Sequence, residues 1–477
     1  MMGSKLAEKI TVLQPLVELS DPHVLDDNKN RRSILSAMYE PLVERDQTGL
    51  FVPALAENWN VSNDARTWTF RLRGQVRFHN GAVVKAGDVV SSLRRSMDPA
   101  LGGVLGTQGV FQSYLGEAEF HEEDDQTVEI VTKQPFADLA DLLVDIPIIS
   151  TSALDGGGLE EAGTGPYRLL SSTGSKMTME PFADYWGRRT PALPVEWIAE
   201  PDEKSRVEEL IHGGADIVSG ISVEGKQIIE KTDKASLIAS RSSVCVIFMF
   251  NLQSRTWKDR RLRQALNYAL DRSELVAKVR GGGAISINGP LTPLHFGYDP
   301  SVPAYTYAPD MTRSLLSEAG YADGIRVVLD VPTILPDEAP RLARVMAEQY
   351  RRVGIRAEIK EFSNREAYAQ MVRSKRMDDA CCFDSSPLST YRVFREKFHS
   401  GVRGPWWQGY SNQTFDTLID QGRATIEASN RQRIYRQAYR IIRNDAPWLF
   451  LYSPNLYWGI GHAAGDWRPT IDGLVKL

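Results

Sequence analysis

Apolar and polar positions follow two different periods along the chain. In residues 66–72 they alternate strictly, which predicts a half-buried strand. Residues 259–272, 342–350 and 434–442 instead repeat apolar side chains every three or four positions, which predicts amphipathic helices. Further strand-like runs occur at 10–13, 244–251, 356–359 and 448–452. Helices and strands that alternate in this way predict the α/β class with mixed sheets.

The length of 477 residues is too great for a single hydrophobic core, so we expect two or three lobes. The runs at 244–251 and 448–452 are candidate places where the chain crosses between lobes. About 25 residues follow the second run, too few for a domain of their own, and we expect them to return to the first lobe. The expected division is lobe one at 5–248 and 450–477, with lobe two at 249–449.

Composition excludes several classes of function. A formal net charge of -5 with 25% charged residues gives no electrostatic basis for binding nucleic acid or an anionic membrane. The three cysteines, Cys245, Cys381 and Cys382, fit neither a metal site nor a disulfide framework, so we expect them on buried strands. The seven histidines are scattered without ligand spacing, and we expect no metal and no cofactor.

The chain also lacks the marks of a membrane span or of a signal peptide. No apolar run approaches the ~20 residues that cross a bilayer. Residues 1–5 lack the apolar core of a signal peptide, so we expect a mature domain whose export signal is absent from this sequence.

Catalytic motifs are missing as well. The sequence has no GxGxxG after a strand, no P-loop, no GxSxG and no HExxH. Aspartate and glutamate are plentiful, but a solvated surface explains them without a paired-carboxylate site. Nothing in the motifs therefore points to an enzyme.

Several ordered segments carry a resemblance instead. They read DPH at 21–23, YEPLV at 39–43, PALAENW at 53–59, TWTFRLR at 67–73, VRFHNG at 76–81, AGDVV at 86–90, GTGPY at 163–167, and DRRLRQAL at 259–266 after Asn251. In order and spacing these blocks resemble the family 5 solute-binding proteins of ABC importers, the dipeptide, oligopeptide and nickel receptors. Most of the blocks also have scaffold roles; we expect the 66–72 strand and the Asn80-Gly81 turn to build a hairpin.

The resemblance implies a two-lobed periplasmic-binding-protein fold (type II, cluster C like) with an extra subdomain in lobe one at about 45–165. It also implies a receptor that captures a small polar solute in the cleft between the lobes and delivers it to ABC permease subunits. We expect a monomer that binds no nucleic acid and works in the periplasm or as a lipid-anchored extracytoplasmic protein.

Two segments are candidates for the solute site. The first follows an apolar run and contains Phe383, Asp384, Ser385, Ser386, Tyr391 and Arg392. The second, in a loop bounded by glycine and proline, contains Trp406 and Trp407, whose rings suit stacking on a solute. Asn251, at the expected crossing, is a further candidate, although a satisfied hinge amide explains it equally well. We expect Asp384, Arg392 and Trp407 to line one pocket.

Two departures from the family pattern concern its peptide anchors. The resemblance places the acid that holds a peptide's amino terminus at Phe383, whereas the nearest acid here is Asp384. The stretch 331–336, where dipeptide receptors carry an arginine for the carboxylate, has none and offers Thr333. Simple dipeptides are therefore disfavoured, and a peptide, an opine, an oligosaccharide or a metal chelate all stay open.

Two other classes compete with the receptor. A hydrolase would use Asp384 with Ser385 or Ser386, but His399 is the one histidine nearby in sequence and no other base is evident. A chaperone or adhesion module would suit the length of the chain and would expose apolar surface.

Overall fold

Two units make up the chain in the computed structural model, which describes residues 8–103, 107, 109–154, 158–187, 191–334 and 336–477. Unit 1 runs to Ser240 and resumes at Leu456, and unit 2 is Arg241–Asn455. These divisions lie beside the boundaries expected at 248 and 449. The expected start of lobe one (residues 5–7) and Leu335 of the 331–336 stretch lie outside the described residues.

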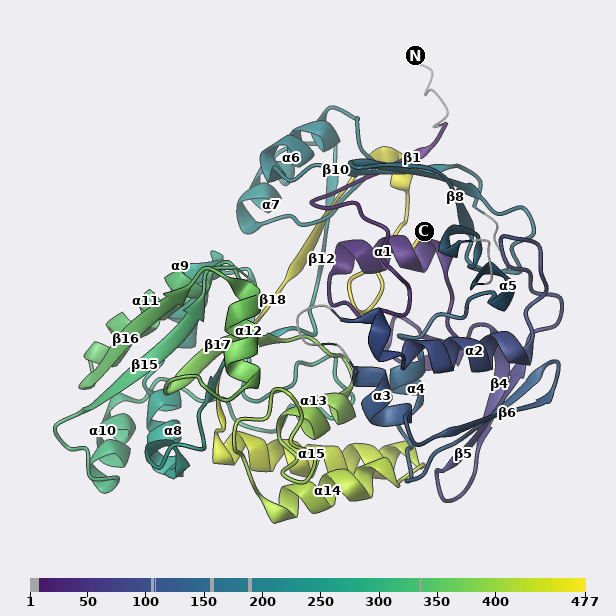
Figure 1. The fold of residues 1–477 in the computed structure, drawn as a ribbon. Coiled ribbons are helices and arrows are strands. Elements are labelled where there is room, and N and C mark those ends of the chain that lie inside the picture. The colour runs from purple at the N-terminus through teal and green to yellow at the C-terminus, as the bar shows by residue number, and fades with distance from the viewer. Residues whose placement is uncertain (1–7, 104–106, 108, 155–157, 188–190, 335) are drawn as a thin grey trace. The chain divides into compact units, whose positions relative to one another are not determined.

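Unit 1 is built on a seven-stranded mixed sheet with the strand order β12-β19-β11-β1-β10-β9-β8. These strands are β1 (Ile10–Gln14), β8 (Tyr167–Thr173), β9 (Lys176–Pro181), β10 (Val195–Ala199), β11 (Ile217–Val218), β12 (Ser236–Ser240) and β19 (Leu456–Ile460). β1 confirms the strand predicted at 10–13 and pairs in parallel with β10 and β11. Val12 and Trp197 of this sheet are fully buried in a core with Met38 of α1 (Lys29–Met38), which lies below the sheet in Figure 1.

A second sheet of unit 1 is antiparallel, with the order β4-β5-β7-β6. Its strands are β4 (Ala56–Val61), β5 (Thr67–Leu72), β6 (Glu119–Asp124) and β7 (Thr127–Val131), and β2 (Val43–Arg45) with β3 (Phe51–Pro53) forms a separate pair. β5 confirms the predicted strand, since Trp68, Phe70 and Leu72 are buried. The expected hairpin is wrong: β5 pairs with β4 and β7, whereas the Asn80-Gly81 turn closes a separate bridge between Arg77 and Val83.

Helices cover both sheets of unit 1. They are α2 (Ala86–Ser96), α3 (Val110–Leu115), α4 (Ala140–Leu143), α5 (Thr151–Leu154), α6 (Glu203–Ile211) and α7 (Val223–Ile229). None of the helices in the described parts of either unit has the length and apolar character needed to cross a bilayer.

Unit 2 is built on one six-stranded mixed sheet with the order β14-β18-β13-β17-β15-β16. Its strands are β13 (Cys245–Phe250), β14 (Ala284–Ser286), β15 (Ile325–Pro332), β16 (Ile355–Phe362), β17 (Ala380–Ser385) and β18 (Trp448–Pro454). The strands predicted at 244–251, 356–359 and 448–452 are therefore confirmed. Cys245 lies in β13, and Cys381 and Cys382 in β17; all three are buried and free, as expected.

The helices of unit 2 include those predicted at 342–350 and 434–442. They are α8 (Arg260–Tyr268), α9 (Arg272–Arg280), α10 (Pro309–Glu318), α11 (Ala339–Arg351), α12 (Arg365–Arg373), α13 (Thr390–Lys397), α14 (Gln413–Arg423) and α15 (Ala428–Asp445). The single helix predicted at 259–272 ends at Tyr268 instead. Asp271 begins α9 there, because its carboxylate accepts the backbone N–H of Glu274 at 3.0 Å.

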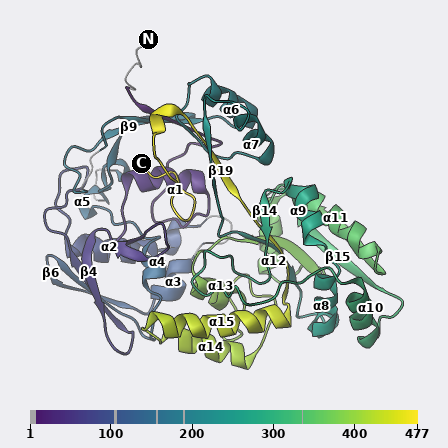
Figure 2. The same ribbon diagram turned by 180° about the vertical axis from the view of Figure 1, so that it is seen from behind.

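The parallel part of the unit 2 sheet follows the order β15, α11, β16, α12, β17 along the chain. Right-handed crossovers in opposite directions put α11 and α12 on opposite faces of these strands. In Figure 1, α12 lies in front of β17, and Figure 2 gives the reverse view. The carboxyl ends of β15, β16 and β17 therefore meet at one edge of the sheet, together with the start of α12.

Candidate functional site

The first candidate segment lies at this carboxyl edge of the parallel strands, the edge at which ligands usually bind to α/β sheets. Phe383, Asp384 and Ser385 are the last residues of β17, and Thr333 directly follows β15. Thr333 donates its backbone N–H to the carbonyl of Phe362 at 3.0 Å, so the ends of β15 and β16 are tied together.

Strand alternation divides the segment between the two faces of β17. The pairing of β17 with β13 runs without a bulge, so Phe383 and Ser385 share one face and Asp384 points to the other. Tyr368 of α12 stacks on Phe383, with ring centroids 6.0 Å apart and planes at 14°. α12 therefore covers the face of Phe383 and Ser385.

Tyr368 fixes α12 on the strands. Its hydroxyl lies 2.7 Å from the carbonyl oxygen of Cys382 and 3.0 Å from that of Asp330, so it donates to the strand backbone. Its complete burial raises the pKa of the phenol well above its usual value, and the hydroxyl stays a donor.

A contact between two aromatic rings brings the two candidate segments together. The ring of Trp406 lies 4.6 Å from that of Phe383, tilted by 45°, and the indole is partly exposed. Arg365 covers Phe383 at 4.5 Å, and Arg373 lies 6.0 Å from the ring of Trp406. The two rings and the two guanidinium groups form one cluster, which we call the Phe383–Trp406 cluster.

Trp407 has different contacts from Trp406. Its indole N–H donates to the carbonyl of Tyr410 at 2.7 Å, and the guanidinium of Arg403 lies 5.4 Å from its ring. Its one polar group thus holds the loop backbone.

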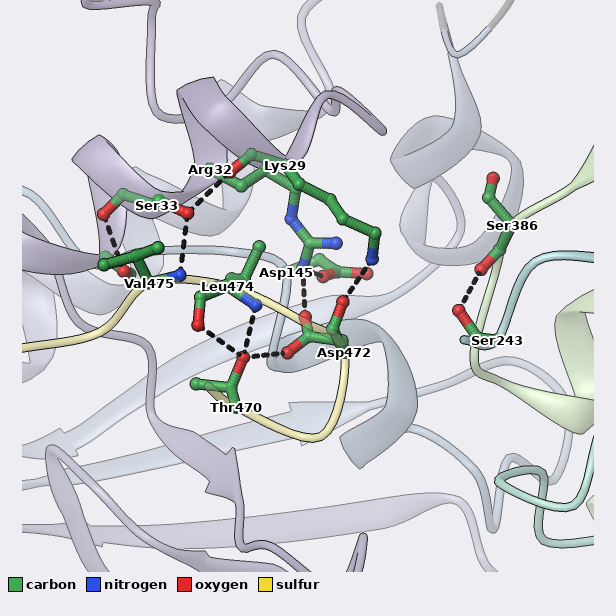
Figure 3. Close-up of polar contacts among 11 residues, drawn as sticks. Lys29, Arg32, Ser33, Asp145, Ser243, Ser386, Thr470, Asp472, Leu474 and Val475 are labelled. Atoms are coloured by element: carbon green, nitrogen blue, oxygen red, sulfur yellow. Dashed lines mark hydrogen bonds and ion pairs between the residues drawn. The ribbon is translucent and has the colours of Figure 1, made fainter. Parts of the chain in front are cut away.

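Arg392 and Tyr391 lie in α13 (Thr390–Lys397). Ser389 begins the helix, with its hydroxyl accepting the backbone N–H of Arg392 at 3.2 Å. The guanidinium of Arg392 donates to Glu396 at 3.1 Å, and both side chains are mostly buried. Ser386, between β17 and α13, accepts the hydroxyl of Ser243 on its carbonyl at 3.0 Å (Figure 3).

Both the nitrogen and the oxygen of the Asn251 amide contact the backbone. The amide nitrogen donates to the carbonyl of Met377 at 3.1 Å, and the amide oxygen accepts the N–H of Gln253 at 3.2 Å. These bonds match the scaffold explanation of this residue.

The histidine of the rival hydrolase lies beside other acids. His399 faces the acids of α14, with ion-pair distances of 3.9 Å to Asp416 and 3.5 Å to Asp420. In the described part of the chain, no three His, Cys, Asp or Glu side chains are grouped so that they could hold a metal ion.

Sequence reasoning missed Arg365 and Tyr368. Both lie on the buried stripe of α12 with Ala369 and Val372, at the three- and four-residue spacing of an amphipathic helix. The sequence signal that could have revealed Arg365 is its spacing: it stands in the same helical stripe as the apolar residues of the segment that precedes β17.

Comparison with known proteins identifies the class of this chain. Residues 51–382 match the model of the bacterial extracellular solute-binding proteins, family 5. The match covers more than half of the chain, and the protein belongs to this family. The family consists of transport proteins that bind solutes, not of enzymes, and it is extracellular.

Individual relatives resemble the chain along nearly its whole length. The glutathione-binding protein GsiB of Pectobacterium atrosepticum is 27% identical over 452 residues, which are 91% of this chain and 86% of the relative. HbpA2 from Haemophilus parasuis superposes with a TM-score of 0.86 at 20% identity, covering 98% of each chain. The periplasmic binding protein DppA from Helicobacter pylori, an ABC transporter-associated protein solved with the peptide STSA, gives a TM-score of 0.79 at 20% identity over 98% of this chain and 96% of its own. The two-lobed periplasmic-binding-protein fold expected from the sequence is thus confirmed.

Proposed function

We propose that this protein is the receptor of an ABC importer, which captures a small polar solute and hands it unchanged to permease subunits in the membrane. The observation that carries the proposal is the family match over residues 51–382. We further propose that the receptor works as a monomer, in the periplasm or lipid-anchored outside the cytoplasm, and binds no nucleic acid.

The Phe383–Trp406 cluster is the part of the proposed solute site with the strongest structural support. It combines a partly exposed indole with guanidinium groups at the carboxyl edge of parallel strands, where solute contacts are expected. Asp384, Ser385, Ser386, Tyr391 and Arg392 stay in the proposed site because they end or follow the same strand. Trp407 and Asn251 stay as well, although their polar groups already serve the backbone.

Native mass spectrometry of the protein, purified without denaturant, tests the receptor function. We expect a bound solute of defined mass, because receptors of this kind release their solutes slowly. Calorimetry with the identified compound should then give a dissociation constant in the micromolar range or below, roughly 8 kcal/mol of binding free energy. A protein that carries no solute and binds none of a broad library of peptides, sugars and organic acids would contradict the proposal.

Simple dipeptides should bind weakly to this site. Thr333 stands where an arginine would grip the peptide carboxylate, and Phe383 stands where an acid would hold the amino terminus. A hydrogen bond to a charged group contributes about 1.5–3 kcal/mol, so each lost anchor weakens binding roughly ten- to a hundredfold. Calorimetry with a dipeptide panel measures this, and sub-micromolar affinity for several dipeptides would exclude it.

A further inference from the structure

Arg365 occupies a position that an amphipathic helix normally gives to an apolar residue. It precedes Tyr368 by three residues and Ala369 by four, and both of these are fully buried on the inner stripe of α12. The guanidinium consequently lies over the sheet, 4.5 Å from the ring of Phe383 and 5.7 Å from that of Tyr368.

Its N–H groups have no acceptor. Nε and Nη1 of Arg365 are buried and have no hydrogen-bond partner among the described residues. Nη2 is not among the buried unpartnered atoms and is the nitrogen that solvent reaches, since the residue as a whole is partly exposed. The two rings supply attraction from their faces, but a ring face replaces neither a counter-charge nor an acceptor for each N–H.

Two other buried arginines of unit 2 have a structural role, and their guanidinium groups donate hydrogen bonds to backbone carbonyls. Arg272, fully enclosed, donates Nε to the carbonyl of Phe450 at 2.6 Å and Nη1 to that of Tyr305 at 3.0 Å. Arg263 donates to the carbonyls of Trp257 and Asp445. Within the described chain, every other arginine with a buried unpartnered nitrogen leaves only Nε in that state, so Arg365 stands apart.

A second polar group without a partner lies on the same face of β17. Ser385 is 2% exposed, and its hydroxyl has no hydrogen-bond partner in the described chain. Alternation puts it on the side of Phe383, the side that α12 covers. A serine hydroxyl and a guanidinium can both donate, so this face offers donors at the strand ends where acceptors are missing.

We infer that Arg365 anchors an anionic group of the solute, a carboxylate, through Nη2, with the Phe383 and Trp406 rings as the wall for the rest of the molecule. The inference rests on the proposed receptor function and names the solute class for the same site. A charge-assisted hydrogen bond from a guanidinium N–H to a carboxylate oxygen is stronger than one to a neutral acceptor, which makes an acid the best match.

The competing role for Arg365 is structural, as a counter-charge to Asp330. That carboxyl lies on the same face, because Asp330 pairs with Cys381 two residues before Phe383, and its Oδ1 is also buried without a partner. A structural arginine would lower the melting temperature of the empty protein when it is removed. An anchor would not, because an unpartnered buried charge costs stability.

The experiment uses the whole protein, emptied by unfolding and refolding, with pairs of acids and neutral counterparts as probes. The pairs are N-acetyl-leucine and its amide, and N-acetyl-phenylalanine and its amide. Calorimetry and melting curves are measured for the wild type, Arg365→Gln, Arg365→Lys and the control Arg341→Gln, an exposed arginine of α11.

For at least one pair we expect the wild type to bind the acid at least tenfold more tightly than the neutral compound. Arg365→Gln should abolish this preference, Arg365→Lys should keep part of it, and Arg341→Gln should leave it unchanged. The melting temperature of empty Arg365→Gln should be no lower than that of the wild type.

Two results overturn the anchor while leaving the receptor function intact: a neutral solute retained in native mass spectra with no preference for any acid, or an acid preference that persists in Arg365→Gln. A loss of several degrees in melting temperature for Arg365→Gln with unchanged binding would establish the structural role instead. If no solute of any kind binds the wild type, the receptor function itself fails.

Discussion

At the scale of single residues, the neighbours Trp406 and Trp407 allow a residue that contacts solute to be compared with one that supports the loop. Trp406→Ala removes the ring that packs on Phe383 while its backbone position stays, so we expect solute affinity to fall. Aromatic pairs contribute about 0.5–1.5 kcal/mol beyond burial, which corresponds to roughly a twofold to tenfold loss. Trp407→Ala should instead lower stability, because its N–H holds the carbonyl of Tyr410. Calorimetry and thermal melts of both variants measure this, and equal effects of the two on affinity would show that both rings touch solute.

The sequence identified the two candidate segments but could not show which of their residues contact one another. The apolar run before Asp384 lies in β17, and a strand signal of this kind is local to the run itself. Which tryptophan meets Phe383 depends on contacts between segments that lie more than 20 residues apart, about which local patterns carry no information. Arg365 was overlooked for a related reason: hydrophobic periodicity counts arginine as polar and so assigns it to the solvent face.

Glu40 provides a test of electrostatics at one residue. Burial raises the pKa of its carboxyl from 4.5 to about 7, although the side chain accepts hydrogen bonds from Thr164 at 3.0 Å and Trp186 at 2.6 Å. The folded state therefore holds a proton more tightly than the unfolded state. This contribution to stability is fully present below pH 4.5 and is lost as the pH rises through 7.

Glu40→Gln keeps the shape of the side chain without the charge. Relative to wild type, its free energy of unfolding should rise between pH 4.5 and pH 8 by roughly 3 kcal/mol, the value of a shift of this size. Urea denaturation at the two pH values gives the difference, with the exposed Glu57→Gln as the control. A difference between variant and wild type that is the same at both pH values would contradict the buried-charge explanation.

At the scale of elements, helix periodicity was read correctly but helix ends were not. The stripe through 259–272 continues across the break between α8 and α9, because both helices face the same core. The break is set by Asp271, whose backbone N–H donates to Gln349 at 2.9 Å while its carboxylate begins α9. Apolar periodicity identifies the buried face of a helix. Where the helix begins or ends depends instead on a single capping residue, which periodicity does not detect.

Asp271→Ala should therefore destabilise the protein through α9 alone. Loss of an N-cap costs about 0.5–2 kcal/mol. Solute affinity should change by less than a factor of two, since Asp271 contacts Gln349 near the end of α11, away from the carboxyl ends of the parallel strands. Chemical denaturation and calorimetry on the same preparation separate the two effects. Asp323→Ala, at an exposed position before β15, is the matched control. An affinity loss as large as that of Trp406→Ala would link α9 to the site.

At the scale of the whole molecule, the two units differ in whether one or two segments of the chain form them. Unit 2 is one continuous stretch, Arg241–Asn455, and contains every strand of its sheet. Unit 1 needs the chain end, because β19 lies between β12 and β11 in its sheet. Farther on, Asp472 pairs with Arg32 of α1 at 3.1 Å and Val475 donates its N–H to the hydroxyl of Ser33 at 2.9 Å, as Figure 3 shows.

This asymmetry predicts which fragments fold. Residues 241–455 expressed alone should give a cooperative thermal transition, whereas residues 1–240 should not, because removal of β19 leaves β12 without its neighbour and exposes the edge of β11. Ser240 and Leu456 are paired residues of the antiparallel β12–β19 ladder, so a two-residue Asn-Gly turn can join them directly. A chain of residues 1–240, Asn-Gly and 456–477 should therefore recover cooperative melting. Circular dichroism melts of the three fragments measure this. Cooperative melting of residues 1–240 alone would show that the C-terminal segment is dispensable for unit 1. Failure of the joined chain to melt cooperatively would show that unit 1 depends on unit 2 to fold.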